Sequence, residues 1–69
     1  MKSDGRERVL AVERILSDRP QTCRKIVHRL AREYGISCNR KAVFQDIAAL
    51  SRYLPIEHEP NKGYFLKKI

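Results

Sequence analysis

The sequence predicts a mostly α-helical domain in which three helices are followed by a short β-hairpin. Apolar residues recur with the 3.6-residue period of a helix in three segments, which end near Pro20, Gly35 and Pro55. After Pro55 this period stops, and two short strand-like segments flank a turn cluster at residues 60–63. A chain of 69 residues has room for one domain, so residues 1–69 are expected to form a single unit.

Local start and stop signals set the boundaries of these elements. Asp4 or Ser3 can cap the first helix, Thr22 the second, and Asn39 or Ser37 the third. A hairpin alone is marginally stable in water, so this one is expected to pack against the helices. The expected elements are helices at about residues 6–18, 22–34 and 39–53 and a hairpin at about residues 55–68.

The third helix has an apolar face and a polar face. At 100° per residue, the apolar stripe falls within about 40° of Val43 and is formed by Val43, Ile47, Leu50 and Leu54. The opposite face carries two cations, an amide and a small residue, namely Lys41, Arg52, Gln45 and Ala48. It contains no carboxylate, whereas a surface helix built only for solubility usually mixes both signs of charge. Phe44 borders this face, and Asp46 lies toward the buried edge, where we expect an ion pair with a neighbouring helix.

The net charge of +7 is confined to the later part of the chain. Residues 1–18 carry four basic and four acidic side chains, whereas residues 19–69 carry eleven basic and four acidic ones. An isoelectric point near 9.9 favours an anionic partner, most commonly nucleic acid. The second helix adds four cations with no acid among them, Arg24, Lys25, Arg29 and Arg32, for which phosphate contacts and a solvated basic face are equal alternatives.

A longer motif surrounds the third helix. Its core is Arg40-Lys41-Ala42-Val43-Phe44-Gln45-Asp46-Ile47, preceded by Tyr34-Gly35-Ile36-Ser37 and followed by Leu50. This motif resembles the recognition-helix signature of DeoR-like and WYL-type bacterial transcription regulators, although Ala42 replaces the usual Thr and Gln45 the usual Arg. The run Gly63-Tyr64-Phe65-Leu66 is similar to the wing strand of the same family. The resemblance covers about residues 8–68 and implies a three-helix winged helix-turn-helix. Such a domain binds double-stranded DNA sequence-specifically, with its recognition helix in the major groove and its wing on the backbone.

The predicted interface residues fall into two groups. Base contacts are expected from Arg40, Lys41 and Gln45, because long donors reach guanine edges and an amide can bond adenine. Phosphate contacts are expected from residues of the second and third helices and of the hairpin tip: Arg24, Lys25, Arg29, Arg32, Asn39, Arg52, Asn61 and Lys62. For His28, a place beside a phosphate and an inert surface position are equal alternatives.

No part of the sequence predicts catalysis, a metal site or a cofactor. The two cysteines, with His28 and His58, do not have zinc-ligand spacing, and Cys23 and Cys38 are expected to be small buried or half-buried residues and not a redox pair. Apolar runs are too short for a membrane span, and no signal peptide is recognisable, so we expect a cytoplasmic, nucleoid-associated protein. Family members continue into an effector-binding domain, whereas this chain stops at Ile69, so no small-molecule effector is expected.

Two further hypotheses compete with DNA binding. Glu57 and Glu59 on the first hairpin strand, with an outward-pointing Phe65, favour a winged helix used as a protein-interaction module. RNA binding is disfavoured, because no row of surface aromatic residues offers base stacking. A homodimer is left open, since the first helix has no net charge and places Leu10 off its main core face.

Overall fold

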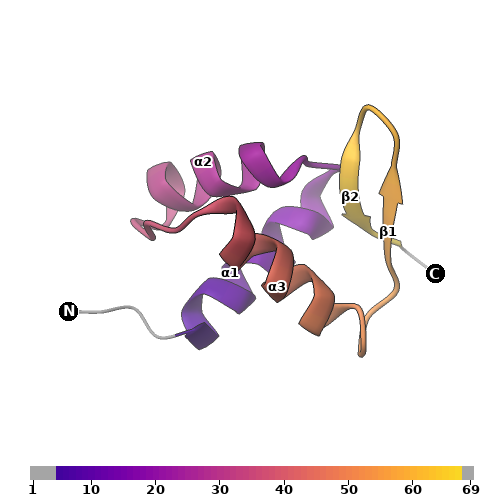
Figure 1. Ribbon diagram of the computed structural model, residues 1–69, viewed down its shortest axis with the longest axis horizontal. Helices are drawn as coiled ribbons and strands as arrows, with labels where there is room; N and C mark the ends of the chain where they lie inside the picture. The colour runs from indigo at the N-terminus through magenta and orange to yellow at the C-terminus, as the bar shows by residue number, and fades with distance from the viewer. Residues whose placement is uncertain (1–4, 68–69) are drawn as a thin grey trace.

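The computed structural model describes residues 5–67 and contains three helices followed by an antiparallel hairpin (Figure 1). The elements are α1 (Gly5–Asp18), α2 (Cys23–Glu33), α3 (Arg40–Leu50), β1 (Ile56–Glu59) and β2 (Gly63–Leu66). The predicted fold class, mostly α with a small β-hairpin arranged as three helices and a wing, is confirmed. The predicted caps Ser3 and Asp4, and the predicted hairpin end at residue 68, lie outside the described residues.

An apolar core fills the space between the helices. α1 contacts α2, α3 and β2, and it lies behind α3 in Figure 1. The buried apolar residues are Ala11, Val12, Ile15, Leu16, Ile26, Leu30, Ile36, Val43, Ile47 and Leu50. Leu10 is exposed, as its position off the core face of α1 predicted. Ile36 was not foreseen as a core residue, because it lies between two helices in a segment without apolar period.

The ends of α2 show the expected capping. The Thr22 hydroxyl accepts a hydrogen bond from the Lys25 N–H over 3.2 Å, which satisfies a backbone donor of the first turn. At the other end Gly35 adopts a φ of 66°, the left-handed conformation that stops a helix. The Ile36 N–H then donates to the carbonyl oxygen of Leu30 over 2.9 Å. These bonds direct the chain from α2 into the connection to α3.

α3 begins where the sequence predicts and ends earlier. The Asn39 Oδ1 accepts a hydrogen bond from the Ala42 N–H over 2.8 Å, which confirms Asn39 as the N-cap. The helix is shorter than the expected range of 39–53, because residues 51–53 form a turn. There the Tyr53 N–H donates to the Leu50 carbonyl three residues back, so the last turn is tighter than an α-helix.

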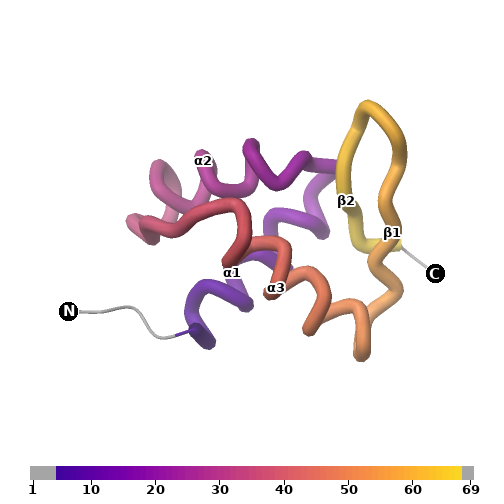
Figure 2. Tube along the Cα trace, in the orientation of Figure 1, coloured from indigo at the N-terminus to yellow at the C-terminus, as the bar shows by residue number. Residues whose placement is uncertain are grey.

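Backbone hydrogen bonds join the hairpin to Gln21 in the α1–α2 connection. The Gln21 N–H donates to the Tyr64 carbonyl over 2.9 Å, and the Tyr64 N–H donates to the Gln21 carbonyl over 2.7 Å. Figure 2 shows the chain before α2 approaching β2 at this point. Gly63 permits the close approach, because a Cβ there would lie 2.2 Å from the Gln21 carbonyl oxygen. The sequence predicts no strand at Gln21, which directly precedes the expected second helix at residues 22–34, so this strand-like pairing was not predicted.

The hairpin turn has the chemistry that its residues predict. The Lys62 N–H donates to the Glu59 carbonyl over 3.1 Å, which closes a four-residue turn with Pro60 in its second position. Asn61, in the third position, has a φ of 71°, as in a type II turn. Ile56, Tyr64 and Leu66 pack against the core, so the hairpin is anchored to the helices as expected (the register pairs Ile56 with Leu66).

Candidate nucleic-acid interface

The outer face of α3 carries two of the predicted base-contacting residues, Lys41 and Gln45, and the third, Arg40, lies in the first turn of the helix. Arg40, Lys41 and Gln45 are all exposed, and Ala48 is exposed one turn further along the helix. Val43, on the opposite side, is completely buried. Arg52 is exposed in the turn that follows α3. The helical phase assigned from the sequence is therefore confirmed, and a donor-rich face of α3 is open to solvent.

The only carboxylate of α3, that of Asp46, lies off this face and pairs with a residue of α1. Arg8 Nε donates to Asp46 Oδ2 over 2.5 Å, and Arg8 Nη2 donates to Asp46 Oδ1 over 3.1 Å. The side chains of Arg8 and Asp46 are 27% and 7% exposed, so the acid is nearly buried. The hydrogen bonds that Arg8 donates to Asp46 raise the pKa of Arg8 above its ordinary value. The expected ion pair of Asp46 with a neighbouring helix is confirmed, and the exposed part of α3 presents no negative charge.

Three of the four predicted cations of α2 are exposed. Arg24, Lys25 and Arg32 form no ion pair within residues 5–67. Arg24 also approaches α3, since it lines a shallow hollow together with Asn39 and Arg40. We call the exposed cations of α2 and of the first turn of α3 the α2–α3 cationic surface (Arg24, Lys25, Arg32, Arg40 and Lys41), and its two parts meet at Arg24 and Arg40.

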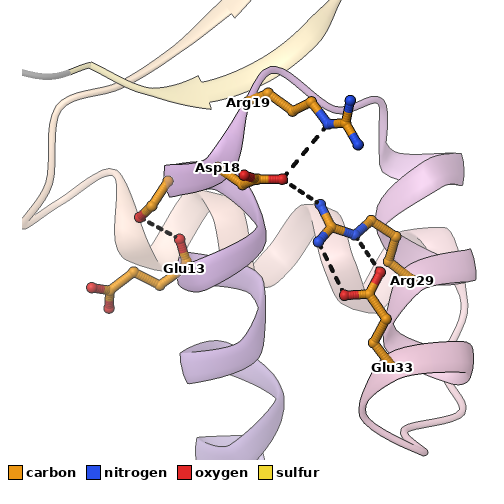
Figure 3. Close-up of polar contacts among 6 residues, drawn as sticks. Glu13, Asp18, Arg19, Arg29 and Glu33 are labelled. Carbon is orange, nitrogen blue, oxygen red and sulfur yellow. Dashed lines mark hydrogen bonds and ion pairs between the residues drawn. The ribbon is translucent and has the colours of Figure 1, made fainter.

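Arg29 is held in a network of acids. Its Nε and Nη2 donate to the two carboxylate oxygens of Glu33 over 2.6 and 3.0 Å, and its Nη1 donates to Asp18 over 3.3 Å (Figure 3). Asp18 also pairs with Arg19 at 3.6 Å, and the Arg29 side chain is only 24% exposed. The hydrogen bonds from Arg29 lower the pKa of Glu33. The network joins the end of α1 to α2. It also neutralises the charge of Arg29, so this residue is not part of the α2–α3 cationic surface. The phosphate contact predicted for Arg29 stays a prediction.

The hairpin contributes little net charge. Glu57 lies 3.9 Å from the Lys67 ammonium, and Glu59 lies 3.8 Å from the Lys62 ammonium, all on exposed side chains. The two acids that argued for a protein partner are therefore balanced by lysines of the same hairpin. Phe65 lies opposite Glu57 in the register, and it is partly buried instead of exposed as expected.

Three other residues considered for DNA contacts differ in their surroundings. Asn61 is exposed at the hairpin tip, where its backbone conformation is fixed by the turn. Asn39 is exposed, but its carbonyl oxygen is occupied as the α3 cap, which leaves its amide N–H groups as donors. His28 is exposed on α2 and lines a shallow hollow with Arg24 and Lys25, so both of its proposed roles stay open.

Two aromatic residues of this region were missed as candidates. Phe44 is 53% exposed on α3, and Tyr53 is 85% exposed in the turn after it. The helical wheel placed Phe44 at the border of the polar face, which was a usable signal. For Tyr53 the signal was obscured, because the expected helix included residues that form a turn.

Both cysteines of the chain pack against the core. Cys23 and Cys38 are half-buried free thiols, and burial raises the pKa of both. Within the part of the chain that the structure describes, no cluster of histidine, cysteine and acidic side chains is placed to hold a metal ion. No described helix is both long enough and apolar enough to cross a membrane.

Comparisons of the chain with protein families, curated proteins and solved structures found no match. The candidate functional site is therefore described from the surface of this domain alone. It consists of the acid-free outer face of α3, the α2–α3 cationic surface beside it, and a hairpin on the same domain.

Proposed function

We propose that this chain binds double-stranded DNA sequence-specifically, as a winged helix-turn-helix domain in transcription regulation. In this proposal α3 enters the major groove and the hairpin lies near the DNA backbone. The inward position of Asp46 is the observation that supports it best, because it leaves the exposed face of α3 with donors and without a carboxylate. A phosphate-lined groove repels carboxylates, so a DNA-reading helix benefits from this arrangement.

The base-reading role is assigned to the N-terminal half of α3. Lys41 and Gln45 lie one turn apart on the exposed face, and the long Arg40 side chain precedes them in the first turn. The Gln45 amide can donate to and accept from an adenine edge, whereas the lysine and arginine reach guanine acceptors or phosphates. N-terminal residues of a recognition helix are the ones that contact base edges in helix-turn-helix docking.

The phosphate-binding role is assigned to α2. Arg24, Lys25 and Arg32 are exposed and form no ion pair among the described residues. The first helix of a helix-turn-helix crosses the DNA backbone, where such cations release bound counterions. Arg24 beside Arg40 supports a phosphate contact between α2 and the start of α3. These contacts supply affinity and orientation but no sequence information.

Selection of bound sequences from a pool of random DNA duplexes tests this proposal. We expect enrichment of a short half-site, singly or as a palindrome if two copies bind together. Gln45→Ala is expected to relax the preference at one base position by about 1–3 kcal/mol. Arg14→Ala, which removes an exposed cation from α1, serves as the matched control and is expected to leave the selected sequence unchanged.

Two results would count against the proposal. A pool without any enriched sequence would exclude site-specific binding. The second result combines two observations: Phe65→Ala abolishes binding to a protein partner, and substitution of Gln45 or Lys25 leaves the affinity for DNA unchanged. Together these would favour the interaction-module hypothesis. The lysine partners of Glu57 and Glu59 remove part of the argument for that hypothesis, because the hairpin is close to neutral.

A further inference from the structure

α3 exposes an apolar ridge, formed by Phe44 and Ala48, beside a polar ridge, formed by Lys41 and Gln45. Phe44 and Ala48 are one turn apart and lie next to Lys41 and Gln45, which are also one turn apart. Phe44 is 53% exposed, and both Phe44 and Ala48 line a shallow hollow between α3 and the hairpin. No described residue of the hairpin therefore covers this ridge completely.

The core does not account for Phe44. Val43 and Ile47, its neighbours on α3, are buried in the core, whereas Phe44 is not among the residues that pack against it. A single exposed apolar residue is ordinary on a protein surface. This one differs because it lies in the half of α3 to which base reading is assigned, beside Lys41 and Gln45, whose side chains offer hydrogen bonds.

We propose that Phe44, supported by Ala48, reads the C5-methyl group of a thymine in the major groove. That methyl is the apolar group among the base edges of the groove, and phenylalanine and alanine side chains are its usual contacts. The inference rests on the proposed DNA binding and adds its second specificity element. The polar ridge then reads hydrogen-bonding edges, and the apolar ridge selects thymine at a neighbouring position.

Uracil substitution tests the contact one methyl group at a time. The duplex selected above is prepared with each thymine replaced singly by uracil, which removes only the C5-methyl. For the wild-type protein we expect one position where uracil weakens binding about fourfold, the equivalent of about 0.8 kcal/mol for one methyl group. In Phe44→Ala the thymine and uracil duplexes are expected to bind equally at that position, while Phe44→Leu retains part of the discrimination.

Tyr53→Ala is the control, because Tyr53 is a more exposed aromatic outside α3. This variant is expected to keep the full thymine preference. The double-mutant comparison of protein and base isolates the Phe44–methyl coupling from any general loss of affinity. Circular dichroism confirms that each variant is folded.

Three results would overturn the inference, and they differ from one another. Enrichment of a site at which no thymine-to-uracil change matters would reject the methyl contact and leave the proposed function intact. Methyl discrimination that survives in Phe44→Ala would assign the contact to another residue. Failure to enrich any DNA sequence would reject both the proposed function and this inference.

Discussion

Arg8 in α1 and Asp46 in α3, which are 38 residues apart in the sequence, form a two-point ion pair with both carboxylate oxygens engaged. The pair has a structural and a surface consequence. It joins α3 to α1, and it holds the only acid of α3 away from the face proposed to meet DNA. A bidentate arginine–carboxylate pair fixes orientation as well as distance, so it reinforces the rotation of α3 against α1 that the core packing sets.

Breaking this pair is expected to destabilise the domain. Asp46→Ala leaves a partly buried Arg8 guanidinium without its acceptor and should lower the free energy of unfolding by about 2 kcal/mol. Asp18→Ala removes a more exposed carboxylate and should cost less than about 1 kcal/mol. Urea denaturation of the two variants measures the difference. Equal losses would show that burial of Asp46 does not matter.

The two left-handed glycines are expected to differ in tolerance to alanine. At Gly63, with a φ of 99°, a Cβ would lie 2.2 Å from the Gln21 carbonyl oxygen, so the Gln21–Tyr64 pairing must open. We expect Gly63→Ala to cost about 3 kcal/mol. At Gly35, with a φ of 66°, the space is open and only the backbone penalty of about 1 kcal/mol applies. Thermal unfolding compares them, and a larger loss at Gly35 would contradict the assigned contact.

Charges on α2 are expected to contribute unequally to DNA binding. Lys25→Ala should weaken binding to all sequences alike and reduce the slope of log K against log salt by about one. Replacing Arg29 and Glu33 together with alanine removes an ion pair of no net charge and should leave the slope unchanged. Affinities for DNA measured between low and physiological salt give the slope for each variant. A slope that falls only for the double variant would place the phosphate contact at Arg29.

The Cys23 thiol is expected to react slowly in the folded protein. Burial raises its pKa above the ordinary value of 9.0, so the native state holds its proton to higher pH than the unfolded state does. The stability that depends on this proton is complete below about pH 9 and is lost as the pH rises further. Alkylation with iodoacetamide in a Cys38→Ala background should be slower in the native than in the urea-unfolded protein. Equal rates at pH 8 would show that Cys23 is not protected.

Residues close together in the sequence determined the helices and the turn. The apolar period placed Val43 and Ile47 inside and Lys41 outside, because a helix repeats its faces every 3.6 residues wherever it packs. Asn39 as a cap and Gly35 at the end of α2 could also be predicted, since caps act through backbone groups a few residues away.

Only the tertiary structure decided which of these groups meet across the chain. It placed Ile36 in the core and paired Gln21 with the hairpin, although neither residue lies in a periodic segment. For the candidate interface, the sequence could name the cations but could not tell that Arg29 is neutralised or that Arg8 holds Asp46. Such pairs depend on how helices cross and rotate against each other, which is set by packing of the whole core and leaves no local pattern in the sequence.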